Sequence, residues 1–224
     1  QEVKKAVGSD KRIGSLFLNA GPGFGGSCFQ KDIFNLIYIC RHLGLKEVAD
    51  FWESVVNINN WQKQRISKLI VQTLFGTVSE KKIAILGYAF KANTNDTRET
   101  PARYIALDLI DEGAKLAIHD PKVSMEKISF DLGDQQSFIE SSEKILGCWE
   151  FAETCEKAIK SADAVVLLTD WEEYKCIDWL KMSKIMRHPA WIFDTRSILD
   201  ESSVKNTKLR VWKLGKDNSV LKEI

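Results

Sequence analysis

The stretch Lys81-Lys82-Ile83-Ala84-Ile85-Leu86-Gly87 decides the fold. It is a short apolar run that two lysines introduce and a glycine ends. A strand buried on both faces in a parallel sheet has this continuous apolar pattern, whereas a strand with one face in solvent alternates apolar and polar residues. Residues 81–87 therefore predict a buried strand of a parallel sheet.

Similar apolar runs follow, with helical segments between them. The pattern predicts a helix from Ala102 to Gly113, with Pro101 at a start position and Gly113 as its C-cap, and another helix around Phe151 to Lys160. Further strands are predicted at Lys115–His119, Ala164–Thr169, Trp191–Asp194 and Arg210–Leu214. Strands that alternate with helices over short connections indicate an α/β fold, a Rossmann-like doubly wound parallel sheet. Residues 122–150 are less regular and receive no assignment.

The period of the apolar residues changes near residue 78. From Lys31 to Phe75 they recur at helical spacing, first in a stripe that Gly44 ends and then in a longer one. The longer stripe would span about 40 Å if continuous. Since it carries Trp52 and Trp61, it fits packing within the chain and packing against a partner equally well. We expect a central helical (dimerisation) region at 1–78 and an α/β domain at 79–224.

Composition excludes several classes of protein. The chain has 224 residues and a net charge of +1, so no strong field would attract nucleic acid or an anionic membrane. No apolar stretch approaches the length of a membrane span. The five cysteines show neither a CxxC pair nor metal-ligand spacing, which indicates a reduced, cytoplasmic protein without a metal. Gln1 is not an initiating Met, and 1–7 resembles the end of a helix, so we expect part of a longer protein.

The run Gly25-Gly26-Ser27-Cys28-Phe29-Gln30-Lys31-Asp32 carries the chemistry. It places Cys28 where a helix is predicted to begin, and the unpaired N–H groups of a helix start favour a thiolate. Lys31 adds a cation, and Asp32 a carboxylate at i+4 from Cys28. A lone cysteine is more often an inert core residue. The glycines at 21, 23, 25 and 26 favour a functional loop, because they let a ligand approach the backbone.

A second group of candidates follows the predicted strands, where ligands bind in such sheets. Lys91 and Arg196 are cations for a phosphate, and Phe90 and Trp171 offer flat apolar faces. Neither the 81–87 strand nor the 21–26 loop has Gly-x-Gly-x-x-Gly in a strand–turn–helix context, so neither predicts an NAD pyrophosphate site. Arg98 and Glu99 also follow the first of these strands. They are either candidates for ligand binding or a local ion pair with each other.

These segments resemble the UDP-glucose/GDP-mannose dehydrogenase family. Phe29-Gln30 stands where GDP-mannose members carry Leu-Pro, and Ser27 where members acting on UDP-N-acetylmannosamine carry His, so the resemblance is to the UDP-glucose branch. It runs from about residue 2 to 215. The segments that carry it are Phe17–Ala20, Gly23–Asp32, Lys82–Lys91, Asp96–Pro101 and Asp120–Val123.

The resemblance implies oxidation of UDP-glucose to UDP-glucuronate with two NAD. Cys28 would attack a C6 aldehyde to give a thiohemiacetal and then a thioester, and Asp32 would orient or activate the hydrolytic water. Arg12 would reach the sugar site of the partner subunit in a homodimer. Positions that match the UDP-sugar lining are Phe17, Leu18, Asn19, Gly25, Phe29, Phe90, Lys91 and Arg196. Positions that match the surroundings of NAD are Ser27, Lys31 and Arg98.

The sequence departs from the family in what it lacks. The N-terminal Rossmann domain and the upstream lysine and asparagine that assist the chemistry are absent, so we expect UDP-sugar binding without turnover. Gly21-Pro22 stands where animal members carry Ser-Val. Three alternatives stay open: a dehydrogenase for another nucleotide sugar, a non-catalytic nucleotide-sugar-binding or dimerisation module, and a Cys-dependent acyl-transfer enzyme. The last would need a histidine base near Cys28, and none of the three histidines has that context.

Overall fold

The computed structural model describes residues 2–133, 140–141, 144–145 and 147–216. A six-stranded sheet has the order β5-β2-β1-β6-β7-β8, and all its neighbouring strands are parallel. Its strands are β1 (Lys82–Leu86), β2 (Lys115–His119), β5 (Cys148–Phe151), β6 (Ala164–Leu167), β7 (Trp191–Asp194) and β8 (Arg210–Lys213). A separate two-stranded hairpin joins β3 (Glu140–Ser141) and β4 (Lys144–Ile145). The prediction of a doubly wound parallel sheet is confirmed.

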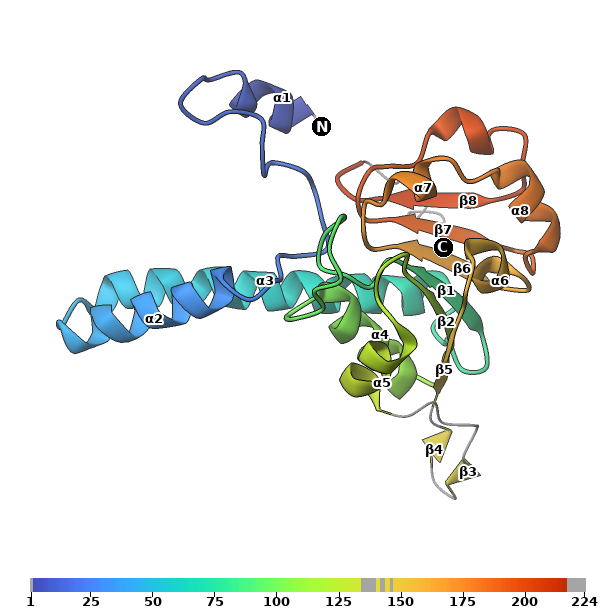
Figure 1. Ribbon diagram of the computed structural model, residues 1–224, viewed down its shortest axis with the longest axis horizontal. Coiled ribbons are helices and arrows are strands. Elements are labelled where there is room, and N and C mark those ends of the chain that lie inside the picture. The colour runs from blue at the N-terminus through green and yellow to red at the C-terminus, as the bar shows by residue number, and fades with distance from the viewer. Residues whose placement is uncertain (1, 134–139, 142–143, 146, 217–224) are drawn as a thin grey trace.

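Helices cover both faces of this sheet (Figure 1). The connections from β1 through β2 to β5 contain α4 (Pro101–Asp111) and α5 (Met125–Leu132). Those that lead to β6, β7 and β8 contain α6 (Cys155–Ile159), α7 (Glu172–Lys175), α8 (Trp179–Ile185) and the 3-10 helix η1 (Glu201–Val204). Strand order reverses between β1 and β6, which makes the carboxyl ends of these two strands the place where such sheets bind ligands.

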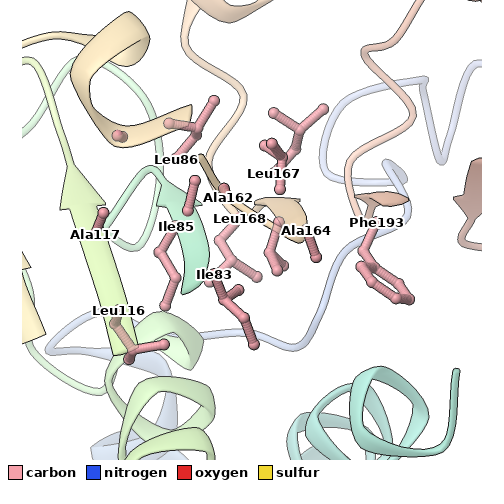
Figure 2. Close-up of a cluster of buried hydrophobic side chains, with 14 of the residues drawn as sticks. Ile83, Ile85, Leu86, Leu116, Ala117, Ala162, Ala164, Leu167, Leu168 and Phe193 are labelled. Atoms are coloured by element: carbon pink, nitrogen blue, oxygen red, sulfur yellow. The ribbon is translucent and has the colours of Figure 1, made fainter. Parts of the chain in front are cut away.

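The core is centred on β1, as its apolar run predicts. Residues 83–86 are all fully buried, while Lys82 at the strand start is half-buried and pairs with Glu150. Figure 2 shows Ile83 and Ile85 among side chains from β2, β6 and β7, including Leu116 and Phe193. Burial of each Ile or Leu contributes roughly 1.5–3 kcal/mol, so this cluster accounts for much of the driving force for folding.

A helical hairpin projects from the sheet domain (Figure 1). It consists of α2 (Phe29–His42) and α3 (Lys46–Thr73), and it follows the short N-terminal helix α1 (Glu2–Gly8). The first half of α3 packs against α2 in a small cluster with Ala49 and Val56. The second half enters the sheet core through Ile66 and Ile70. Since α3 serves both cores, the domain boundary near residue 78 stays a prediction.

The structure corrects some element boundaries. Phe151 ends strand β5, so the helix predicted from Phe151 to Lys160 is shorter and covers 155–159. Glu112 is the C-cap of α4, and Gly113 follows it with φ +85°. Within 122–150, which received no assignment, lie α5 and β3 to β5, while 134–139, 142–143 and 146 are outside the described residues. The end of the predicted 79–224 domain, 217–224, is also outside them.

The cysteines and the helices bear on the expectations from composition. All five cysteines are free thiols, including Cys40 in the α2–α3 core and the half-buried Cys155. Within the described part of the chain, no helix combines the length and the apolar character that crossing a membrane requires.

Candidate functional site

Cys28 is the N-cap residue of α2, as the sequence predicts. Its carbonyl accepts the first helical hydrogen bond, from Asp32 N at 2.8 Å, and its thiol is exposed with Ser27 Oγ at 3.5 Å. The N–H groups of the first helical turn have no partner within a helix and point toward this end. Lys31 and Asp32 are exposed on the same turn. The thiol therefore lies in a positive field, with one cation and one carboxylate close in sequence.

The glycine loop that carries Cys28 is packed against the loop that follows β1. Gly26 N donates to Arg98 O at 2.8 Å, and Gly26 has φ +89°. A β-carbon at Gly25 would lie 2.4 Å from Glu99 O, and one at Gly26 would lie 3.0 Å from the Phe90 ring. The absence of a β-carbon at these two glycines is therefore required for packing within the chain, and the approach of a ligand to their backbone stays a prediction.

Gly25→Ala should lower the free energy of unfolding by about 1–3 kcal/mol, because the new methyl group would overlap a backbone carbonyl. Gly21→Ala is the matched control. Its β-carbon would meet only the side chain of Arg196, nearest at Nη1, 2.8 Å away, and no backbone atom within 4 Å. Urea unfolding of both variants measures the difference. Equal stability of Gly25→Ala and the wild type would show that the loop is not docked in this way.

The hairpin holds the other side of the glycine loop through Asn59. This buried side chain accepts a hydrogen bond from Phe24 N at 2.8 Å and donates one to Phe24 O at 3.1 Å. Lys63, one turn further along α3, is only 2% exposed and has its ammonium 4.0 Å from the centroid of the Tyr104 ring. Burial lowers the pKa of Lys63, against an opposing effect of Glu99. Sequence analysis missed both residues, although a polar residue within an apolar helical stripe is a usable signal.

Arg196 ties the loops at the carboxyl ends of the strands together. Its Nε donates to Leu168 O at 2.7 Å and its Nη2 to Phe90 O at 3.3 Å, so it bridges the ends of β1, β6 and β7. Burial lowers the pKa of this guanidinium, and Asp170 opposes the shift. The sequence predicts Arg196 as a ligand-binding cation, and the structure places it at the strand-order reversal with part of its donors already used.

Asp120 organises the loop after β1. Its Oδ2 accepts from Tyr88 N at 2.7 Å, Ala89 N at 3.0 Å and Trp171 Nε1 at 3.1 Å. Trp171 is only 5% exposed, so the prediction that it offers a flat face to a ligand is wrong, because it is part of the core instead. Sequence analysis did not single out Asp120 as a positioning residue, and only the structure shows this role.

Phe90 and Lys91 lie together at the end of this loop. Lys91 is exposed, and its ammonium lies 5.3 Å from the centroid of the Phe90 ring. The structure thus brings Phe90, Lys91, Arg196 and Gly25 of the predicted substrate residues to one region. Phe29 is exposed beside them, and its ring packs edge-on against Phe24 with 4.7 Å between centroids.

The predicted residues before the glycine loop do not join this group. Phe17 is 99% exposed with φ +60°, and Leu18 is half-buried. Asn19 accepts a hydrogen bond from Lys4 of α1 at 2.6 Å. Arg12 is exposed and pairs with Asp10 at 2.7 Å. This N-terminal segment loops outward from the glycine loop and brings α1 back beside the sheet domain, where Glu2 and Val3 line one pocket with Lys213 and Leu214 (Figure 1).

Arg98 supplies a cation near the thiol. It makes a two-point ion pair with Asp96, with Nε–Oδ1 at 2.9 Å and Nη2–Oδ2 at 2.8 Å, rather than the alternative pair with Glu99. Glu99 instead accepts a hydrogen bond from Tyr104 OH at 2.6 Å. Asp96 raises the pKa of Arg98, and the charge of the Cys28 thiolate adds to this effect. The guanidinium of Arg98 and the sulfur of Cys28 therefore interact electrostatically.

The arrangement can bind an anion beside a nucleophile. An exposed thiol at a helix start lies next to a loop that carries Phe90, Lys91 and Arg98, at the strand-order reversal of a parallel sheet. Such a site suits a phosphate-bearing substrate with an electrophilic carbon.

Comparisons with known proteins agree with this picture. The model of the UDP-glucose/GDP-mannose dehydrogenase family, UDP binding domain, matches residues 84–201, and that of the family's central domain matches residues 1–61. The chain is 48% identical over 215 residues to a UDP-glucose 6-dehydrogenase of Drosophila melanogaster, covering 96% of this chain and 45% of that protein. It is 44% identical to a UDP-glucose 6-dehydrogenase of Caenorhabditis elegans, covering 96% of this chain and 44% of that protein.

Among solved structures, the chain is similar to a UDP-glucose dehydrogenase from Pyrobaculum islandicum. The TM-score is 0.73 at 28% sequence identity, over 95% of this chain and 42% of that one. A UDP-D-ManNAc dehydrogenase from Pyrococcus horikoshii matches with a TM-score of 0.67 at 26% identity, over 94% of this chain and 43% of that one. The chain thus spans less than half the length of these relatives.

Proposed function

Since the chain belongs to the UDP-glucose/GDP-mannose dehydrogenase family, we propose that it is the central and UDP-binding part of an NAD-dependent UDP-glucose 6-dehydrogenase. The full protein would oxidise UDP-glucose to UDP-glucuronate. The observation that carries this proposal is the position of Cys28, exposed at the start of α2 on a loop docked against Phe90 and Arg98. The names of the relatives support the choice of sugar nucleotide.

Cys28 is the proposed nucleophile. Its thiolate would add to the carbonyl carbon of a C6 aldehyde, and the aldehyde oxygen would take up a proton to give a thiohemiacetal. Oxidation of that adduct leaves a thioester on Cys28, which keeps the acyl carbon in place until water attacks it. Asp32, one turn into α2, would accept a proton from this water and orient it. Hydrolysis then returns the thiol and releases the uronate.

The proposed substrate contacts come from both parts of the chain. Lys91 and Arg196 would balance the charge of the diphosphate, and Phe90 would pack against an apolar face of the nucleotide. Gly25 and Phe29 would lie at the sugar end beside Cys28. Phe17, Leu18 and Asn19 would complete the lining only if the exposed N-terminal segment closes over the site.

NAD would lie at the edge of the site beside the Cys28 thiol. Ser27, Lys31 and Arg98 surround the thiol with a hydroxyl and two cations, a donor set that suits an anionic dinucleotide. The loop after β1 lacks the glycine pattern that holds a pyrophosphate, so we infer that the main NAD contacts lie in the part of the relatives that this chain does not span. NAD, when bound, supplies the hydride acceptor for both oxidations. We therefore expect no turnover from residues 1–224 alone.

A homodimer is part of the proposal. Several large apolar side chains of the α2–α3 hairpin stay exposed in the single chain, which is a feature of contact surfaces. Arg12 would reach the sugar site of the partner subunit, and its exposed position on the N-terminal segment is compatible with that role. The exposed side chains are Phe34, Tyr38, Phe51, Ile58 and Trp61.

Counting the NADH formed per UDP-glucose consumed tests the proposal. The chain extended to the length of its relatives should form two NADH per UDP-glucose, because a primary alcohol loses four electrons to become a carboxylate. GDP-mannose should not replace UDP-glucose. Faster turnover of GDP-mannose would support the alternative of a dehydrogenase for another nucleotide sugar. Binding of UDP-glucose with no NADH formed from any nucleotide sugar would support the non-catalytic binding module.

A further inference from the structure

A second group of chemically active side chains lies at the carboxyl end of β2, apart from Cys28. His119 is the last residue of β2, Cys155 the first of α6, and Glu173 belongs to α7. Cys155 Sγ lies 3.5 Å from His119 Nδ1 and 3.5 Å from Glu173 Oε1, and His119 Nδ1 lies 3.7 Å from the same oxygen. Segments far apart in the sequence thus converge on one point with three different ligand types.

These separations match the edges of a tetrahedral metal site. A zinc ion with bonds of about 2.3 Å to sulfur and about 2.0–2.2 Å to nitrogen and oxygen keeps its ligand atoms about 3.4–3.6 Å apart. The observed separations of 3.5, 3.5 and 3.7 Å need shifts of only a few tenths of an ångström. We propose that His119, Cys155 and Glu173 bind Zn²⁺, with water as the fourth ligand.

The surroundings prepare these groups for a metal. Tyr174 OH donates its proton to His119 O at 3.0 Å, so its oxygen accepts from Nδ1–H of His119 at 3.1 Å in the metal-free chain, and metal binding through Nδ1 requires the tautomer with the ring proton on Nε2. Burial lowers the pKa of His119, against opposing effects of Glu173 and Asp120. Burial, followed by Glu173, raises the pKa of Cys155 to about 12. A bound cation would displace that thiol proton to solvent, and thiolate and carboxylate would together neutralise the ion.

The position of the site gives it a structural role, separate from the proposed dehydrogenase chemistry. His119 is only 6% exposed, while Glu173 is exposed and leaves an entry path for the ion. Asp120, which holds the loop after β1, directly follows His119. Zinc would fasten α6 and α7 to the end of β2 beside this loop. We expect it to stabilise the fold without being required for turnover.

Two measurements on the chain test the proposal. Titration with Zn²⁺ against a competing chelator gives the number of ions bound and the dissociation constant, and calorimetry gives the melting temperature. The wild type should bind one Zn²⁺, with a rise in melting temperature. Glu173→Gln, at an exposed position that should not impair folding, should raise the dissociation constant at least about tenfold, as should Cys155→Ser. Glu172→Gln and Cys176→Ser are matched controls, because they change a neighbouring carboxylate and an exposed thiol outside the cluster.

Substitution with Co²⁺ identifies the ligands directly. The wild type should show a sulfur-to-cobalt charge-transfer band and the intense visible bands of a tetrahedral ion, and Cys155→Ser should lose the first while Cys176→Ser keeps it. No Zn²⁺ binding by the wild type, or equal binding by the Glu173→Gln and Glu172→Gln variants, would show a metal-free hydrogen-bonded cluster and overturn the proposal. Neither result bears on NADH formation, so the proposed function is tested independently.

Discussion

Cys28→Ser should lower NADH formation by the full-length enzyme roughly a thousandfold or more while leaving its affinity for UDP-glucose nearly unchanged. A serine hydroxyl at the start of α2 would have the same position but would not ionise near neutral pH, so it cannot add to an aldehyde as a thiolate does. An ester on serine would also hydrolyse more slowly than a thioester. Binding, under the proposed function, would depend on other groups, chiefly Lys91, Arg196 and Phe90.

Steady-state NADH formation and calorimetric binding of UDP-glucose, measured on the same preparation, separate these two effects. Cys176→Ser is the matched control, since that thiol is exposed and lies outside the proposed active site. It should retain full turnover. Turnover of Cys28→Ser at the wild-type rate would refute the assignment of Cys28 as nucleophile, whereas a loss of binding equal to the loss of turnover would make it a structural residue of the loop.

Asp120→Asn should lower the free energy of unfolding by about 3–6 kcal/mol, because buried N–H groups would lose their acceptor at about 1–3 kcal/mol each. Asp120 is 4% exposed. Its Oδ1 accepts from the backbone N–H groups of Lys122 and Val123 at 2.9 and 3.0 Å, in addition to the three donors at Oδ2. An amide in its place turns one of the two acceptors into a donor that faces other donors.

A loss of that size is a large part of the stability of an ordinary domain, about 5–15 kcal/mol. Urea unfolding followed by tryptophan fluorescence measures it, and Trp171 near Asp120 should report the change directly. Asp50→Asn, at an exposed position of α3, is the control and should shift the free energy of unfolding by no more than about 0.5 kcal/mol. Similar unfolding curves for the two variants would contradict the role of Asp120 in holding the loop after β1.

Much of the fold could be predicted from the sequence because the relevant signals are local. The continuous apolar run at 83–86 shows burial on both faces, and β1 lies where it predicts. Cys28 as the N-cap of α2 follows from the change from glycine loop to helical period. The signal for the start of α4 is equally local. Pro101 is its first residue, and the side chain of Thr100 accepts a hydrogen bond from Ala102 N at 3.3 Å. Each of these depends on residues within a few positions.

The shorter elements could not be predicted in the same way. Residues 148–151 form a strand whose partners are all on β2, and its pattern of exposure is mixed because, among the described residues, one side of the strand has no neighbour in the sheet. A mixed pattern of this kind does not distinguish a strand from a helix, so the sequence predicts that the helix begins at Phe151. Tertiary pairing, rather than intrinsic propensity, makes it a strand.

The sequence by itself determined the parallel sheet, the two successive helical stripes and the position of Cys28 at a helix start, because periodicity and helix starts are properties of neighbouring residues. Only the tertiary structure decided the roles of residues whose partners lie far along the chain. It placed the glycine loop against Glu99 and Phe90, buried Trp171 against Asp120, and committed part of Arg196 to backbone carbonyls. It also gathered His119, Cys155 and Glu173 at one point. Contacts of this kind follow from the order in which the strands pair, which no local pattern encodes.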